Sequence, residues 1–171
     1  DLEGTYDAAL TVSNASTSYR MVFSNMVSAS PAELYVSQTG RHVPPFNDLL
    51  TAATNIQAAL DLAMDGATVW LDDGVFQIPE TLLLCRPVTL KSLHGKESTT
   101  LDGMGERSVI QLWHPQARLE GVRIVHGNGI RGGGISALGG GQIANSSIVS
   151  NTASQGGGIY ALGTTCITNC D

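Results

Sequence analysis

The chain has 171 residues, of which 42% are hydrophobic and only 14% are charged, with 20 glycines and a formal net charge of −6. Its nine Lys and Arg residues are scattered singly, which excludes the basic patch of a nucleic-acid binder. No segment approaches the roughly 20 apolar residues of a membrane-spanning helix. We therefore expect one main, turn-rich, all-β domain, with no nucleic-acid partner and no membrane span within these residues.

Residues 1–33 predict an N-terminal β extension, or the end of a preceding domain. Residues 6–12 and 19–27 have the composition of two strands, and a polar segment joins them. A hairpin alone is marginally stable in water, so these strands are expected to pack on another element. The chain begins at Asp1 without a leader, and we expect either that processing removed its start or that it is an excised piece, which favours a secreted origin.

Residues 55–64 predict a short amphipathic helix, because their apolar residues recur at helical spacing. Thr54 or Asn55 is the candidate N-cap, and Gly66 is the candidate stop. Segments 67–71 and 75–78 follow as strands around a turn, and segments 88–90, 100–101 and 109–112 are the next strand candidates. The helix is expected to cap the open end of the structure that these strands begin.

Residues 118–141 align with residues 142–165 at an offset of 24, with nine identities. The longest shared element is Gly-Gly-Gly-Ile, at residues 132–135 and again at 156–159. A period of this length, built from short β-branched runs and glycine turns, is typical of a solenoid whose coils each hold three short strands. The leucine-rich repeat is excluded because its leucine spacing is absent.

The repeat predicts which side chains face the interior. Ile143, Ile148, Ile159 and Ala161 are expected to point inward and to stack on their equivalents in the next coil about 4.8 Å away. The glycine triplets are expected at corners between strands, where a tight bend leaves no room for Cβ.

Several segments resemble the entry region of right-handed β-helices of the pectin-lyase-like type. These segments are Leu34-Tyr35-Val36-Ser37 with Gly40, residues 55–60, residues 67–69 and residues 73–76. The repeats resemble those of polymorphic outer membrane proteins, which combine a Gly-Gly-small-Ile element with a hydrophobic-x-x-Asn element; Gly157-Gly158-Ile159 and Val149-Ser150-Asn151 approximate these. The resemblance covers residues 34–171 and implies a right-handed parallel β-helix, with regular coils from about residue 118.

Fourteen of the 15 acidic residues lie at or before Glu120, so the regular coils lack the paired carboxylates of a glycosidase. The closest acidic groups are Asp72-Asp73 and Asp102 with Glu106, which lie in expected turns. His94, His114 and His126 fall near strand ends, and His126 with Arg123 and Arg131 could line a sugar-binding surface. We assign no catalytic, cofactor-binding or metal-binding residue, and expect no cofactor.

Two sequons make Asn14 and Asn145 candidate glycosylation sites. The three cysteines form no zinc pattern. Cys166 and Cys170 are a candidate disulfide; alternatively, Cys85 is buried in its apolar run and the other two pair elsewhere or stay free.

The sequence favours a non-enzymatic extracellular or cell-surface module with a structural or adhesive role, part of a larger chain or fibrous assembly. The expected partners are other protein subunits or downstream parts of the same chain, and glycans. Because no closing segment follows Gly163, we expect the polypeptide to continue beyond Asp171 or another subunit to stack there. The alternatives are the N-terminal fragment of a polysaccharide lyase or glycoside hydrolase with its catalytic coils downstream, and a carbohydrate-binding module, for which outward aromatic residues are few.

Overall fold

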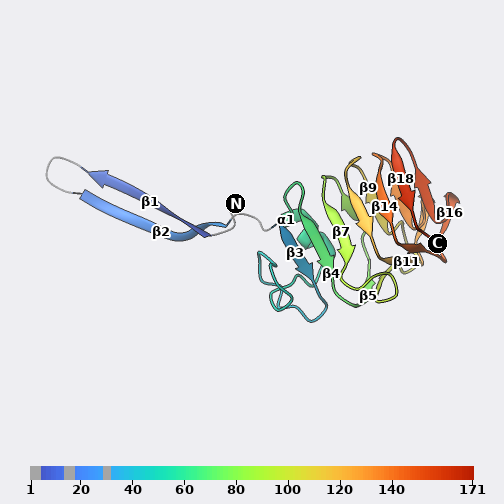
Figure 1. Cartoon of the computed structure of the whole chain (residues 1–171), viewed down its shortest axis with the longest axis horizontal. Helices are drawn as coiled ribbons and strands as arrows, with labels where there is room; N and C mark the ends of the chain where they lie inside the picture. Colours follow the sequence, from blue (N-terminus) through green and yellow to red (C-terminus); the bar gives the residue numbers. More distant parts are fainter. Residues whose placement is uncertain (1–4, 14–17, 29–31) are drawn as a thin grey trace.

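The structure is a computed structural model that describes residues 5–13, 18–28 and 32–171. Residues 32–171 wind into a stack of coils whose strands pair in parallel from one coil to the next (Figure 1). The prediction of an all-β, right-handed parallel β-helix with 24-residue coils is confirmed. Pairing across the repeat follows the predicted offset, since Arg118 lies opposite Gln142 and Gln142 opposite Cys166.

Three parallel sheets form the walls of the solenoid, and we call them sheets 1, 2 and 3. Sheet 1 contains β3 (Glu33–Val36), β4 (Thr68–Leu71), β7 (Thr89–Ser92), β10 (Arg118–Glu120), β14 (Gly141–Ala144) and β18 (Thr165–Thr168). Sheet 2 contains β5 (Gly74–Gln77), β8 (Thr99–Asp102), β11 (Arg123–Val125) and β15 (Ser147–Ile148). Sheet 3 contains β6 (Leu82–Leu84), β9 (Ile110–Leu112), β13 (Ile135–Ala137) and β17 (Ile159–Ala161).

A fourth, two-stranded sheet lies between sheets 2 and 3 along the chain, and we call it the outer sheet. It pairs β12 (Asn128–Arg131) with β16 (Thr152–Gln155). These two strands are not predictable from the sequence, because they are polar and exposed and therefore lack the apolar alternation that marks a core strand.

The core consists of aliphatic side chains stacked in columns along the solenoid axis. Ile110 and Ile135 are neighbours in sheet 3, and both are completely buried, as is Ile143 of sheet 1. Burying one such side chain contributes about 1.5–3 kcal/mol. Ile148 and Ile159 are partly buried and pack on the same core, as predicted. Ala161 is exposed, although its equivalent Ala137 is completely buried.

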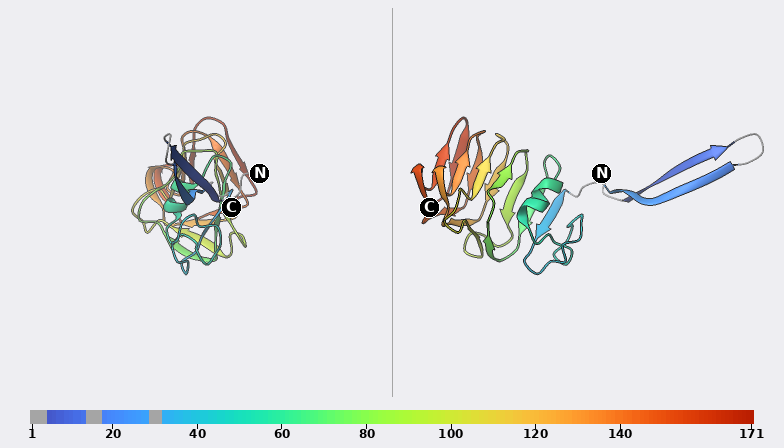
Figure 2. Two further views of the ribbon diagram at one scale, coloured as in Figure 1. Left: turned by 90° about the vertical axis from the view of Figure 1, so that its left-hand side faces the viewer. Right: turned by 180° about the vertical axis from the view of Figure 1, so that it is seen from behind.

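The helix α1 (Ile56–Leu62) lies at the β3 end of the stack (Figure 2). The Asn55 side chain accepts a hydrogen bond from the Ala58 N–H at 3.2 Å, which makes Asn55 the N-cap. The helix ends at Leu62, before the predicted stop at Gly66, and the Arg86 guanidinium donates to the Ala63 carbonyl at 2.9 Å. A side chain from the next coil thus holds the exposed carbonyl end of the helix.

The first glycine triplet lies between the outer sheet and sheet 3. Only Gly132 has a positive φ, at +69°. At Gly133 a Cβ would lie 2.3 Å from the Thr152 carbonyl oxygen, and at Gly134 it would lie 2.7 Å from the Gly158 carbonyl oxygen. The prediction that the triplets leave no room for Cβ is therefore confirmed for this triplet, where close contact between coils is the main reason. It is wrong at Gly158 of the second triplet, where the nearest atom to a Cβ would lie 3.5 Å away.

The strands β1 (Thr5–Ser13) and β2 (Ser18–Ser28) pair in antiparallel fashion, so the predicted N-terminal hairpin is present (Figure 1). Figure 1 shows this hairpin outside the stack of coils. The candidate glycosylation site Asn14 lies outside the described residues.

Candidate functional site

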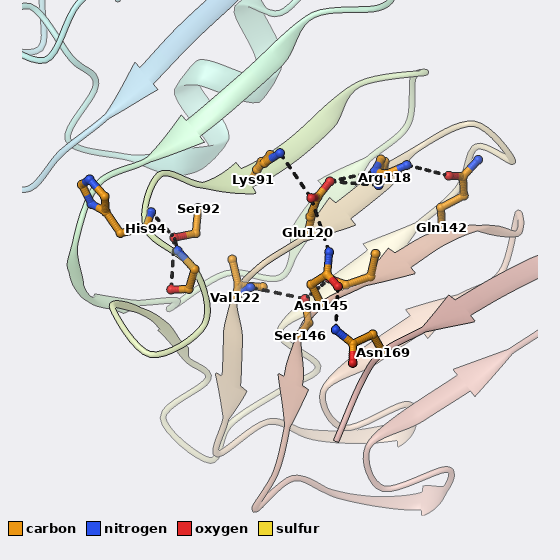
Figure 3. Close-up of polar contacts among 12 residues, drawn as sticks. Lys91, Ser92, His94, Arg118, Glu120, Val122, Gln142, Asn145, Ser146 and Asn169 are labelled. Carbon is orange, nitrogen blue, oxygen red and sulfur yellow. Dashed lines mark hydrogen bonds and ion pairs between the residues drawn. The ribbon is translucent and has the colours of Figure 1, made fainter.

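A polar network covers the outward face of sheet 1 (Figure 3). The Glu120 carboxylate lies 3.2 Å from the Lys91 ammonium and 2.9 Å from the Arg118 guanidinium, and its side chain is only 17% exposed. Burial alone would raise the pKa of Glu120, but the two cations together hold this pKa below its ordinary value. Arg118 also donates to the Gln142 side chain at 3.1 Å. Glu120 is therefore an ionised member of a surface network.

The corner between sheets 1 and 2 repeats one backbone conformation in three coils. Gly121, Asn145 and Asn169 have φ values of +71°, +53° and +52°. The Asn169 side-chain amide donates to the Asn145 side-chain oxygen at 2.8 Å, and Asn145 donates to Glu120 at 3.5 Å. The candidate glycosylation site Asn145 is exposed, but its amide already belongs to this stack (Figure 3).

An open groove of about 780 Å³ runs along the outward face of sheet 3 beside the outer sheet. Hydroxyl, amide, guanidinium and carboxylate groups line it, together with two aliphatic side chains: Thr81, Glu106, Arg107, Ser108, Gln111, Asn128, Gly129, Ile130, Arg131, Ser136, Leu138 and Ser154. Arg107 forms an ion pair with Glu80 at 2.5 Å, and Arg131 lies over the Tyr160 ring at 5.4 Å. Such a groove can hold an extended polar ligand.

The acidic and histidine residues singled out from the sequence form separate local contacts. His94 lies 2.8 Å from Asp73, and His126 lies 3.1 Å from Asp102. Asp72 accepts a hydrogen bond from Ser37 at 2.8 Å. The structure does not combine these carboxylates into one cluster.

The sugar-binding surface suggested by His126, Arg123 and Arg131 is divided between elements. Arg123 begins β11 of sheet 2, whereas Arg131 ends β12 of the outer sheet. His126 lies between them at a left-handed corner and pairs with Asp102. Of the three, only Arg131 lines the groove.

The three cysteines are free thiols in the structure. Cys166 occupies the outward position of β18 opposite Gln142, whereas Cys170 packs against the core. The Cys166–Cys170 disulfide therefore stays a prediction. The alternative that Cys85 is buried is wrong: Cys85 is exposed because Leu82 and Leu84 take the two inward positions of β6 and leave Leu83 and Cys85 outside.

The outward positions of sheet 3 form an uncharged, mostly apolar surface, which we call the apolar face. Its members are Leu83, Cys85, Gln111, Trp113, Ser136, Leu138, Tyr160 and Leu162. Ser136 is buried among them, and Arg131 of the outer sheet lies over Tyr160. Trp113, Leu162 and Leu83 are 49%, 45% and 41% exposed. Backbone bonds from Trp113 to Leu84 and from Leu162 to Ala137 hold these positions in the ladder of the solenoid. The apolar face was not predicted, because the early coils differ in length from the 24-residue repeat. The sequence therefore does not show that Leu83 and Trp113 share a wall with Leu138 and Leu162.

Among the described residues, no cluster of His, Cys, Asp and Glu is arranged to hold a metal ion, and none of the helices in those ranges has the length and apolarity of a membrane span. Comparison of the chain with protein-family models, with curated proteins and with solved structures finds no match.

Proposed function

We propose that the chain is a non-enzymatic, extracellular or cell-surface module with a structural and adhesive role, and that the apolar face is its contact surface. One observation carries this proposal: a rigid wall of the solenoid presents Trp113, Leu162 and Leu83 with 41–49% of each side chain exposed. Exposed apolar side chains that gather on one face of a soluble protein mark interaction sites.

The other walls differ from the apolar face in their charge. Sheet 1 carries Lys91, Arg118 and Glu120 outward, and sheet 2 carries Asp102 and Arg123 outward. Charged edges and faces are the usual protection of β-structure against association. The strand positions that point outward in sheet 3 are uncharged, although Glu106, Arg107 and Arg131 line the neighbouring groove. The strands of this wall therefore lack the charged protection of the other two walls.

A bead assay and an antibody assay test this proposal. Beads carrying the protein are expected to adhere to intact cells of its natural source, and beads carrying an inert protein are not. Antibody against the protein should label those cells without permeabilisation. Labelling that appears only after permeabilisation would exclude the surface location.

The extracellular location also supports Asn145 as a glycosylation site. Peptide mapping of the natural protein before and after removal of N-linked glycans is expected to show an added mass on the peptide that contains Asn145. An unmodified Asn145 in every molecule would remove this part of the proposal.

A second candidate function is polysaccharide cleavage by a longer, pectin-lyase-like enzyme to which these coils belong. The groove favours it, since Glu106, Arg107 and Arg131 line an open channel beside hydroxyl and amide groups. Release of new reducing ends, or of unsaturated sugar ends, from acidic and neutral polysaccharides would support this candidate and overturn the non-enzymatic one.

A further inference from the structure

We propose that the groove beside sheet 3 contains an oxyanion-binding site built from Arg131, Ser136 and Gln111. Its ligand is a carboxylate, sulfate or phosphate group carried by a larger molecule. All three residues line the groove. The inference goes beyond the proposed function, because it requires neither adhesion through the apolar face nor cleavage of a polysaccharide.

The strand register brings the three residues to one part of the groove. Gln111 lies opposite Ser136 in neighbouring strands of sheet 3, and Ser136 lies opposite Tyr160 in the next strand. Neighbouring strands of a sheet are about 4.8 Å apart. Arg131 reaches this column from the outer sheet, since its guanidinium carbon lies 5.4 Å from the centre of the Tyr160 ring. The guanidinium therefore lies over the strand that adjoins Ser136.

The positive charge of Arg131 is available to an external anion. Within the part of the chain that the structure describes, the Tyr160 ring is the only polar or ionic partner of this side chain. Contact with an aromatic ring uses none of the five N–H donors of arginine, and these donors form a fork that matches a carboxylate or phosphate. The other guanidinium of the groove differs, because Arg107 pairs with Glu80 and Glu106.

Ser136 supplies a second donor. This residue is only 3% exposed, and its hydroxyl forms no hydrogen bond with any described residue. A buried polar group without a partner costs free energy. An acceptor atom that enters from the groove would remove this cost.

Gln111 supplies the third donor, because Trp113 fixes the orientation of its amide. The Trp113 indole N–H donates to the Gln111 side-chain oxygen at 3.1 Å. The NH2 group of the same amide has no acceptor in residues 32–171, so it is free to donate. A guanidinium, a hydroxyl and an amide NH2 group all offer donors here, which selects a ligand group whose atoms accept hydrogen bonds.

The acidic residue that lines the groove lies away from Arg131. The Asn128 N–H donates to the Arg107 carbonyl at 2.9 Å, so Glu106 and Arg107 adjoin the start of β12. Arg131 ends this strand three residues later, about 10 Å away. The whole chain has a net charge of −6, which opposes anion binding in general. We therefore expect a local site of modest affinity, with a dissociation constant for a single oxyanion on the order of 1–10 mM.

An NMR titration of the unmodified protein tests the inference. Sodium chloride is replaced stepwise by sodium sulfate, sodium phosphate or sodium acetate at constant ionic strength, so that general screening stays the same. Saturable shifts of the Arg131, Ser136 and Gln111 signals are expected with at least one of these ions. Saturation with sulfate or phosphate identifies a tetrahedral ligand group, and saturation with acetate identifies a planar carboxylate. The absence of saturation with all three ions overturns the inference.

Substitutions locate the binding site. Arg131→Gln removes the guanidinium and is expected to weaken binding at least about tenfold, and Ser136→Ala is expected to weaken it by about threefold or more. The matched control is Arg123→Gln, which removes the same charge from an exposed arginine of sheet 2 outside the groove and should bind like the unmodified protein. The amide spectrum of each variant reports its folding.

Unchanged binding by Arg131→Gln or by Ser136→Ala overturns the inference. Equal weakening by Arg123→Gln and Arg131→Gln also overturns it, because anions would then respond to net charge rather than to the groove. Neither result bears on the adhesion of beads that carry the protein, so the proposed function is judged separately.

Discussion

The side-chain amide of Asn169 donates a hydrogen bond of 2.8 Å to the side-chain oxygen of Asn145, which lies one 24-residue repeat earlier. Both residues have left-handed backbone conformations, which asparagine adopts more readily than other residues that carry a Cβ. The sequence repeat therefore produces the same corner in successive coils. At each corner the asparagine supplies both the left-handed backbone conformation and a side-chain hydrogen bond to its equivalent.

The Asn145 corner predicts a ranked response to substitution. Asn145→Ala loses the amide contacts and strains a backbone at φ +53°, so we expect it to lower the free energy of unfolding by about 1–2 kcal/mol. Asn145→Gly loses only the contacts and should cost less, since Gly121 already occupies the equivalent position. Urea unfolding measures both, and an alanine variant no less stable than the glycine variant would contradict the role of the backbone.

Asn151 ties together two neighbouring coils. Its oxygen accepts from the Gly127 N–H at 2.7 Å, and its amide donates to the Ile124 and Val149 carbonyls, each at 3.0 Å. Asn151→Ala removes these partners from the Gly127 N–H and the Val149 carbonyl, whereas the Ile124 carbonyl keeps its bond from the Val149 N–H, and we expect a loss of about 2–4 kcal/mol. Asn128→Ala, which removes one exposed contact, is the control, and similar urea midpoints for the two variants would contradict this account.

Glycine positions one repeat apart should respond differently to alanine. At Gly134 a Cβ would lie 2.7 Å from Gly158 O and from the Ile148 side chain, whereas at Gly158 its nearest contact would be 3.5 Å. We expect Gly134→Ala to destabilise the protein by about 1–3 kcal/mol and Gly158→Ala to have little effect. Thermal unfolding of both variants checks this, and equal melting temperatures would show that close contact between coils does not require the glycine.

Glu120 predicts a pH dependence of stability. Burial opposes ionisation of Glu120, but Lys91 and Arg118 together lower its pKa in the folded state. The contribution of Glu120 to the free energy of unfolding is therefore fully present above its unfolded pKa of about 4.3. It is lost as the pH falls through the lower folded pKa. At pH 7, Glu120→Gln should therefore be less stable by about 1 kcal/mol. In urea unfolding, this difference should shrink below about pH 4; a difference independent of pH would contradict the ion-pair explanation.

The sequence predicted the solenoid because its signal is local and periodic. Gly132–Gly134 and Ile135 recur one coil later, and that offset is the register of β13 with β17. The strand β6 and the exposure of Cys85 were missed, although the alternation of Leu82, Leu83 and Leu84 was visible. The reason is that Thr68 pairs with Thr89 and Thr89 with Arg118, so the early coils differ in length from the later ones.

The apolar face could not be predicted for the same reason. Leu138 and Leu162 align through the repeat, but Trp113 lies in a coil with a different spacing, and only the strand register places it in their column. In the early coils, turns of different length hold the extra residues without disturbing the stacked strands. A fixed offset in the sequence therefore does not identify which residues stack on one another there.

The central claim is that the outward side of sheet 3 is the contact surface, and the most direct test is the adhesion of beads that carry single variants. Beads with Gln142→Glu are expected to adhere to intact cells of the natural source as well as beads with the unmodified protein, whereas beads with Trp113→Glu should lose most of their adhesion. Equal adhesion of the two variants would contradict the claim.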